Sequence, residues 1–281
     1  MALRPRTLSV SSVETWIANP YALFAGRILG LEAMPALGTP PDGALRGQIL
    51  HEALGRFTEA YPAAALPADV AGELMAHLRA TLSDYADDQR VVAFWLPRFE
   101  RFADWFATTE PSRRAGVTAI ASEARGKIVI DAPAGPFTLT ARADRIDATP
   151  RGYVVTDYKS GTPPDKRKVK EGHAPQLSLE AAILIAQGIG TLPPGPVSTL
   201  RYVRAGGGEP PGDVTDVVVG ADEVAALAAR ARDELAAMVA HFDTETTPYR
   251  AVRRARFSYD YDDYAHLARV DEWSTDNGEA E

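Results

Sequence analysis

The 281-residue chain is long enough to bury a substantial core, as one domain or as one domain with an appendage. Hydrophobic residues make up 46% and charged residues 24%, and no run of 18 apolar residues offers a membrane span. The net charge of −8 argues against a polyanionic partner, and the lack of cysteine excludes disulfides, thiolate zinc sites and cysteine-ligated iron–sulfur clusters. Any metal must therefore be bound by oxygen or imidazole ligands, which favours Mg²⁺ or Mn²⁺. Because no apolar signal core follows the first six residues, we expect a cytoplasmic protein.

The first 115 residues predict a helical N-terminal part. Ser11 and Glu14 have the spacing of a capping box, so an amphipathic helix is expected from Ser11 through Ile28. Proline and glycine predict a loop over 35–43. Apolar residues at helical spacing then predict three further helices, over about 44–60, 68–88 and 91–109.

From Gly116 the pattern changes to that of strands. Alternating residues between turn signals predict five strands, over 117–130, 137–146, 153–157, 199–203 and 214–219. Helices are expected over 175–187 and 221–242, and a basic loop should follow the third strand. This order predicts an α/β or α+β fold with a helical part (1–115), a sheet core (116–245) and a tail (246–281).

Positive charge is concentrated in two short segments. Four of the five lysines lie within 159–170, and with Arg167 and Asp165 they give this stretch a local charge of +4. A second basic cluster lies within 250–256. An isolated basic run is usually a solvated loop. The first cluster, however, begins inside the motif described next, so we interpret four of its residues as contacts to a polyanion: Lys166, Arg167, Lys168 and Lys170.

Two carboxylates are expected to face each other across a hairpin. Residues 149–152 have turn chemistry, with proline second and glycine fourth. Folding the chain about this turn sets Asp144 opposite Asp157, and alternation puts Lys159 on the same face as Asp157. Opposed carboxylates, with Cβ atoms roughly 5 Å apart, are destabilising unless a cation neutralises them. A divalent ion beside a fixed ammonium is what phosphodiester hydrolysis requires.

These residues resemble the active-site motif of RecB-type PD-(D/E)XK nucleases. The resemblance rests on Asp144 and on the later run Asp157-Tyr-Lys-Ser-Gly, and it extends over about 8–187. Upstream, Arg46-Gly-x-x-x-His51 is similar to the helix-borne histidine of the family. Gln176-Leu, after the basic segment, is similar to the beginning of its glutamine helix.

The resemblance implies a restriction-endonuclease-like core, a mixed sheet flanked by helices, in a single nuclease domain (1–281). It implies that Mg²⁺ or Mn²⁺ is held by four groups: His51, Asp144, Asp157 and the backbone carbonyl of Tyr158. Lys159 would position or activate the attacking water and stabilise transition-state charge. Gln176 would orient Lys159 or the backbone.

The tail, 260–273, resembles the carboxyl end of AddB proteins of the alphaproteobacterial type. This implies a nuclease that cuts single-stranded DNA from an unwound duplex, with exonuclease favoured over endonuclease action. It also implies an AddA-type helicase-nuclease partner and a role in double-strand break repair by recombination. The chain would be the C-terminal part of a longer subunit or a freestanding relative.

Two positions depart from this family. Asn19 precedes Pro20 where many relatives have a cysteine of an iron–sulfur cluster, and Glu180 stands where relatives often carry tyrosine. Without the cluster, the aromatic and apolar tail 257–273 is expected to be ordered and to pack on the first helix.

Several interpretations remain open in the sequence. A lone histidine such as His51 on an amphipathic helix is commonly a core residue. Glu123 on the first strand is within reach of the site, but a solvated strand carboxylate is the preferred interpretation. The main alternative function is a catalytically silent DNA-binding or structural module. A third is a magnesium hydrolase of small phosphoesters. The retained Asp144, Asp157 and Lys159 favour the nuclease.

Overall fold

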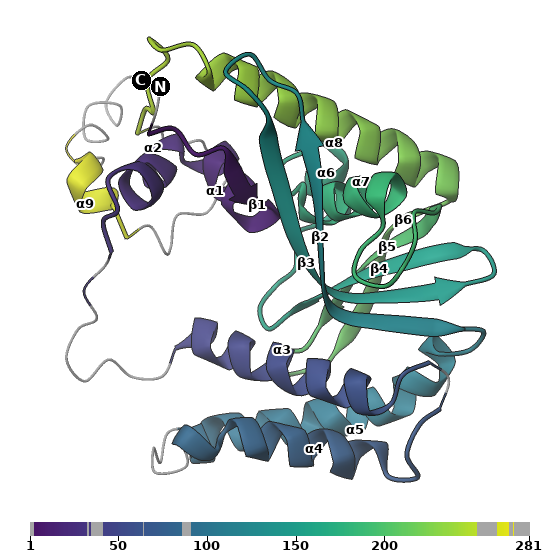
Figure 1. The fold of residues 1–281 in the computed structure, drawn as a ribbon. Coiled ribbons are helices and arrows are strands. Elements are labelled where there is room, and N and C mark those ends of the chain that lie inside the picture. The colour runs from purple at the N-terminus through teal and green to yellow at the C-terminus, as the bar shows by residue number, and fades with distance from the viewer. Residues whose placement is uncertain are drawn as a thin grey trace, which may run out of the picture.

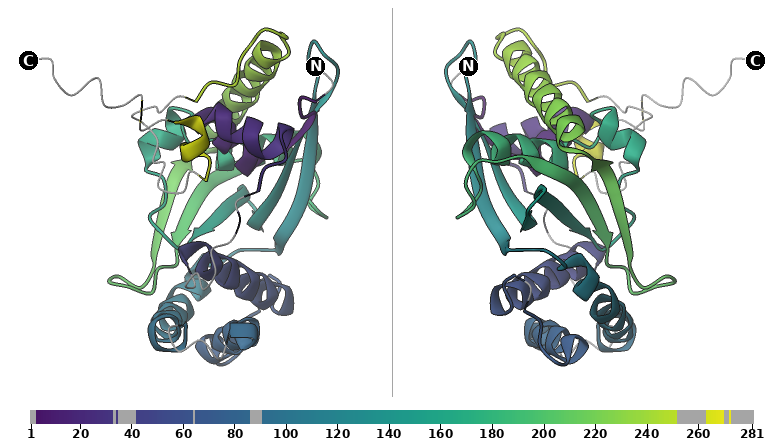
Figure 2. Two further views of the ribbon diagram at one scale, coloured as in Figure 1. Left: turned by 90° about the vertical axis from the view of Figure 1, so that its left-hand side faces the viewer. Right: turned by 90° about the vertical axis from the view of Figure 1, so that its right-hand side faces the viewer.

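The computed structural model describes residues 3–32, 34, 42–63, 65–85, 91–251, 263–269 and 272 of the chain (Figure 1). In this part a six-stranded mixed sheet lies between two layers of helices (Figure 2). The strand order is β1-β3-β4-β5-β6, and β2 pairs with β3 as well. The mixed sheet flanked by helices that the sequence predicts is confirmed.

The strands are β1 (Thr7–Ser9), β2 (Ala119–Ile130), β3 (Phe137–Thr149), β4 (Gly152–Lys159), β5 (Val197–Arg204) and β6 (Asp213–Val219). The longer helices are α1 (Val10–Ala18), α3 (Gly43–Ala60), α4 (Val70–Thr81), α5 (Leu96–Arg113), α7 (Gln176–Gln187) and α8 (Ala221–Phe242). The short helical segments are α2 (Pro20–Leu23), η1 (Phe24–Ile28), η2 (Ser83–Tyr85), η3 (Val91–Trp95), α6 (Lys166–Lys170) and α9 (Ala265–Ala268).

The N-terminal segment differs from the expected single helix. Ser9, and not Ser11, caps α1, because its side chain accepts a backbone N–H of the first turn. The helix ends at Asn19, which caps α2 in turn, since Pro20 cannot continue the backbone hydrogen-bond ladder. The strand β1, which pairs in parallel with β3, was not expected from the sequence. Three residues are too few to show the alternation of a strand.

The β3–β4 hairpin has the register that its turn predicts. Gly152 supplies a positive φ of 113° at the turn, and the ladder ends with Arg145 opposite Thr156. Asp144 and Asp157 therefore lie one step beyond the last pair. β4 and β5 run parallel, and the chain between them passes through α6 and α7.

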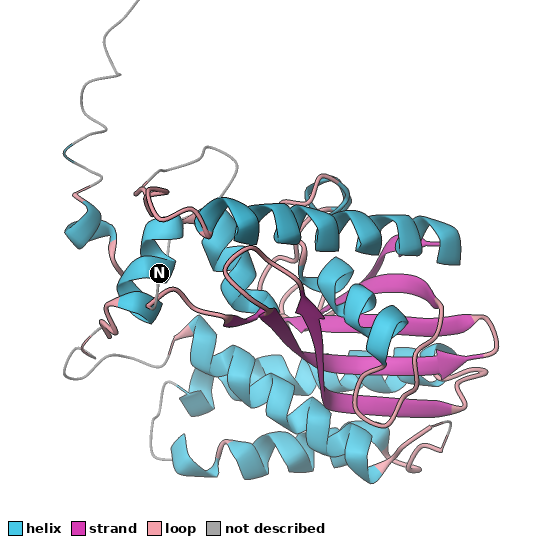
Figure 3. Cartoon of the chain, turned by 45° about the horizontal axis from the view of Figure 1, so that its top comes forward, coloured by secondary structure: helices cyan, strands magenta, loops and turns pink. Residues whose placement is uncertain are grey.

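Helices cover both faces of the sheet (Figure 3), and each face packs on them through its own hydrophobic core. One core joins the sheet to α1, α7 and α8, and Trp16 and Leu177 belong to it. The other joins it to α3, α4 and α5, where Phe57, Phe102 and Phe106 pack together. Within the part of the chain that the structure describes, no helix is both long and apolar enough to cross a membrane.

The chain returns to its N-terminal helices after α8. The ring of Tyr249 lies 5.8 Å from that of Phe24 and 4.7 Å from that of Phe242, centroid to centroid. Tyr264 Oη donates to the carbonyl oxygen of Leu31 at 2.7 Å. The short helix α9 follows Tyr264 and lies beside α2 (Figure 1). Much of the tail expected to pack there, 252–262, 270–271 and 273–281, lies outside the described residues.

Candidate active site

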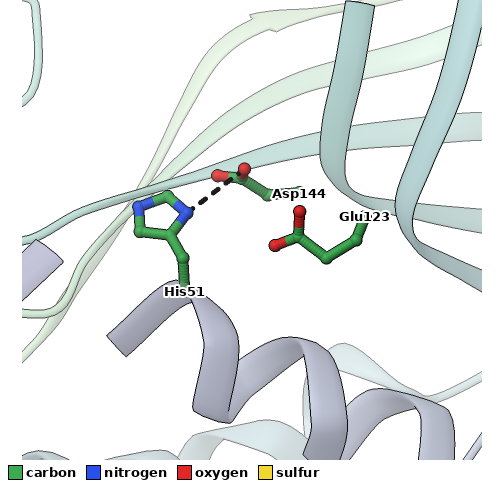
Figure 4. A group of neighbouring side chains, drawn as sticks. All are labelled: His51, Glu123 and Asp144. Atoms are coloured by element: carbon green, nitrogen blue, oxygen red, sulfur yellow. Dashed lines mark ion pairs between the residues drawn. The ribbon is translucent and has the colours of Figure 1, made fainter. Parts of the chain in front are cut away.

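Three side chains with metal-ligating atoms converge from three elements (Figure 4). His51 comes from the middle of α3, Glu123 from β2 and Asp144 from β3, and their ligand atoms all lie within 4.8 Å of one another. His51 Nδ1 is 3.2 Å from Asp144 Oδ1. All three residues are partly buried. One imidazole and two carboxylates suit a divalent cation, and the carboxylate oxygens favour Mg²⁺ or Mn²⁺.

Glu123 reaches this group because β2 is locally irregular. Its φ of 51° is a left-handed conformation that residues other than glycine rarely adopt. The described β2–β3 ladder pairs the residues on both sides of Glu123 but passes over Glu123 itself. Gly55 of α3 leaves room for the side chain, since a Cβ there would lie 3.0 Å from Glu123 Cγ. The interpretation of Glu123 as a solvated strand residue was therefore wrong: its side chain is 17% exposed and lies in the cluster.

A second group consists of Asp157, Lys159 and Gln176. Lys159 Nζ donates to Asp157 Oδ1 at 3.0 Å and to Gln176 Oε1 at 2.9 Å, and it lies 2.8 Å from Asp157 Oδ2. Gln176 Nε2 donates to Asp157 Oδ1 at 2.5 Å. Gln176 is the first residue of α7, so this helix brings the amide to the end of β4.

Asp144 connects the two groups. Its Oδ2 accepts the backbone N–H of Tyr158 at 2.8 Å, while its Oδ1 faces His51. The Tyr158 side chain lies in the core on the α3–α5 side of the sheet, where Arg145 Nη1 donates to its hydroxyl at 3.4 Å. Tyr158 therefore borders the metal-ligating cluster with its backbone N–H, and its ring also lies edge-on to the imidazole of His51, with 6.5 Å between the ring centroids.

Burial and like charges perturb the ionisation of these groups. Burial, with help from the charge of Asp144, raises the pKa of Asp157 to about 6, although Lys159 opposes the shift. Burial and then Asp144 also raise the pKa of Glu123. For His51, burial lowers the pKa, but the carboxylates of Asp144, Asp157 and Glu123 outweigh it and the pKa lies above its usual value. An excess of buried negative charge favours cation binding.

A buried ion-pair network supports the strand behind the site. Arg145, next to Asp144, donates from Nη1 to Glu110 of α5 at 2.6 Å and from Nε to Asp147 at 2.7 Å. Glu110 also accepts a hydrogen bond from Arg114 Nε at 2.6 Å. The network ties β3 to α5, so it restricts the backbone that carries Asp144.

The basic segment includes a short helix, α6, where a loop was expected. Asp165 caps this helix and Val169 is buried against the sheet core, which leaves Lys166, Arg167 and Lys168 exposed. Lys170 Nζ is 2.7 Å from Glu223 of α8, so its charge is already paired.

One family model matches most of the chain. The model of the PD-(D/E)XK nuclease superfamily matches residues 7–256. The chain is 26% identical over 193 residues to an uncharacterized protein of Rickettsia conorii and 25% identical over 193 residues to one of Rickettsia felis. These matches cover 66% of this chain but 22% of each relative, so the chain spans only a small part of the relatives' length. The solved structure of SSO0001 matches with a TM-score of 0.31 and 11% identity, over 83% of this chain and 77% of that one.

Proposed function

The chain belongs to the PD-(D/E)XK nuclease superfamily, and we propose on that premise that it is a metal-dependent deoxyribonuclease that hydrolyses phosphodiester bonds. One observation carries the proposal. The cluster of His51, Glu123 and Asp144 adjoins the hydrogen-bonded group of Asp157, Lys159 and Gln176, through the contact of Asp144 with the Tyr158 backbone. Together they combine metal ligands with a fixed ammonium.

The metal site would combine ligands from the helix α3 with ligands from the neighbouring strands β2, β3 and β4. Mg²⁺ or Mn²⁺ would be held by five groups: His51, Glu123, Asp144, Asp157 and the Tyr158 carbonyl. The bound ion would polarise the phosphate and lower the pKa of a water molecule. Glu123 extends the ligand set expected from the sequence, and its oxygen donors suit the same hard cations.

Lys159 would stabilise the negative charge that develops on the phosphate and would position the attacking water. Its ammonium is already held by Asp157 and Gln176, so it would need little reorganisation when that charge develops. Gln176 would act through Lys159 and not on the substrate.

The substrate would be single-stranded DNA delivered by a helicase, with exonuclease favoured over endonuclease action. The resemblance of the tail to AddB proteins supports an AddA-type partner and a role in recombinational repair in the cytoplasm. The much longer relatives are consistent with a domain of a large subunit. The exposed cations of α6, Lys166, Arg167 and Lys168, would contact the phosphate backbone.

End-labelled linear DNA, single- and double-stranded, tests the proposal directly. We expect cleavage with Mg²⁺ or Mn²⁺, none with a chelator, and none by Lys159→Ala. Stepwise shortening from an end would identify an exonuclease. Binding without cleavage in either metal would favour the silent module, and cleavage of a small phosphodiester but not of DNA would favour the third alternative.

A further inference from the structure

We infer that Glu14 of α1 is a positioning residue, which holds Gln176 and through it Lys159 in the geometry of the nuclease site. The inference rests on the proposed function and extends the site to a helix that carries neither a proposed metal ligand nor a residue of the Asp157–Lys159–Gln176 group. Glu14 and Gln176 are 162 positions apart in the sequence, and their contact joins α1 to α7.

The first turn of α7 needs an acceptor from elsewhere in the protein. The first N–H groups of a helix lack partners within the helix, and a capping side chain usually accepts one of them. The N-cap of α7 is Pro175, whose side chain has no acceptor atom. Glu14 Oε1 takes this role, because it accepts the backbone N–H of Gln176 at 3.2 Å. A carboxylate at this helix end also interacts favourably with the helix dipole.

The surroundings of Glu14 connect it to the same group. Burial raises the pKa of Glu14, and two neighbours oppose the shift: the charge of Lys159 and the N–H of Gln176. A partly buried carboxylate is costly unless it is hydrogen-bonded or paired. The contacts with the Gln176 N–H and with the charge of Lys159 therefore offset part of the burial penalty of Glu14, and they are lost if either residue moves away.

Gln176 is held at its backbone and at both ends of its amide. Its Nε2 donates to Asp157 Oδ1 at 2.5 Å and to Glu180 Oε1 at 3.2 Å, and its Oε1 accepts from Lys159. The Asp157 carboxylate and the Lys159 ammonium fix the orientation of the amide, because NH₂ can only donate and the carbonyl can only accept. Asp157 and Lys159 thus orient the amide, while Glu14 fixes the backbone that carries it.

A double-mutant cycle separates this role from general stabilisation. The rate constant of a single DNA turnover is measured at saturating Mn²⁺ and DNA for wild type, Glu14→Ala, Gln176→Ala and the double variant. We expect Glu14→Ala to lower the rate constant on the order of tenfold to a hundredfold, as a small displacement of a reacting group does. In the Gln176→Ala background the same change should alter the rate by less than about twofold. Glu14→Gln, which keeps an oxygen acceptor, should recover most of the rate.

Glu52→Gln is the matched control, because Glu52 follows His51 on α3 but is exposed and pairs with Arg56. This variant should cleave like wild type. Equal losses from Glu14→Ala in both backgrounds, or a wild-type rate in Glu14→Ala, would overturn the inference.

Amide hydrogen exchange tests the inference independently of DNA cleavage. Amide hydrogen exchange over the first turn of α7 should accelerate in metal-free Glu14→Ala and remain unchanged in Glu52→Gln. Unchanged exchange in Glu14→Ala overturns the positioning role. Failure of wild type to cleave, by contrast, overturns the proposed function.

Discussion

Asp157 is 2% exposed, and its pKa near 6 shows that burial outweighs the stabilising contact with Lys159. A carboxyl with a raised pKa holds its proton more tightly in the folded chain than in the unfolded chain. Its contribution to the free energy of unfolding therefore falls as pH rises from about 4 to about 6 and stays unfavourable above that. We expect Asp157→Asn to raise the melting temperature of the metal-free protein at pH 8 while abolishing cleavage. Melting curves with a chelator and an assay on labelled DNA check both, and a lower melting temperature or wild-type cleavage would contradict the assignment.

The same pKa values predict how metal binding depends on pH. Metal ligands must lose their protons before they bind, and both Asp157, with a pKa of about 6, and His51, with a raised pKa, retain protons in mildly acidic solution. The affinity for Mn²⁺ should therefore fall between about pH 8 and about pH 5.5. Calorimetric titration at the two pH values measures the difference. Equal affinities would mean that neither group binds the ion.

At the scale of elements, the irregularity of β2 has a cost that can be measured. Glu123 has a φ of 51°, and a left-handed conformation costs a residue with a side chain roughly 1–2 kcal/mol, whereas glycine adopts it freely. Glu123→Gly should leave the metal-free melting temperature unchanged or raise it, although the contact with the exposed Arg142 is lost. The variant should lose most of the stabilisation by Mn²⁺ and most of the cleavage. Retention of both would remove Glu123 from the metal site.

The elements differ in how far the sequence predicts them. The β3–β4 hairpin follows from its turn residues, and α3 follows from apolar spacing, because local chemistry determines both. Local patterns do not show that Glu123 leaves the ladder opposite β3, since this depends on a contact with α3. Glu14 illustrates the same limit: its spacing from Ser11 predicted a cap for its own helix, but its carboxylate binds α7. The positions of the Glu123 and Glu14 side chains therefore depend on contacts with residues that are distant in the sequence.

The helix α6 allows a test of DNA binding with an internal control. Reversal of its three exposed cations, in the variant Lys166→Glu, Arg167→Glu, Lys168→Glu, should weaken binding to all single-stranded sequences alike. It should also flatten the salt dependence, because phosphate contacts release counterions. Lys170→Glu should have a smaller effect than Lys168→Glu alone, since Lys170 is already paired with Glu223. Binding isotherms at several salt concentrations measure both, and an unchanged salt slope for the triple variant would show that α6 does not contact DNA.

At the scale of the whole molecule, the site depends on both helical layers. His51 belongs to α3 on one face of the sheet, whereas Gln176 belongs to α7, which packs in the other core. The metal-ligating cluster with His51 and the group with Gln176 are joined by Asp144. Asp144 lies on β3, which the Glu110–Arg145 ion pair ties to α5. Correct docking of both layers on the sheet is therefore a condition for a complete site.

The last prediction concerns the contact between the two ends of the chain. Tyr249 lies between Phe24 and Phe242, with Arg4 above its ring at 5.6 Å, and it packs on the core that contains Trp16. Because the side chain is only half-buried, Tyr249→Ala should lower the free energy of unfolding by about 2 kcal/mol, less than for a fully buried aromatic residue.

Tyr249→Phe is the matched control, since it keeps the ring contacts and should unfold like wild type. Cleavage measured well below the melting temperature should persist in both variants, because the ring lies in the terminal cluster and not in the metal site. Chemical denaturation measures the difference between the two variants. If Tyr249→Ala unfolds like Tyr249→Phe, the packing of Tyr249 on the N-terminal helices contributes nothing to the stability of the fold.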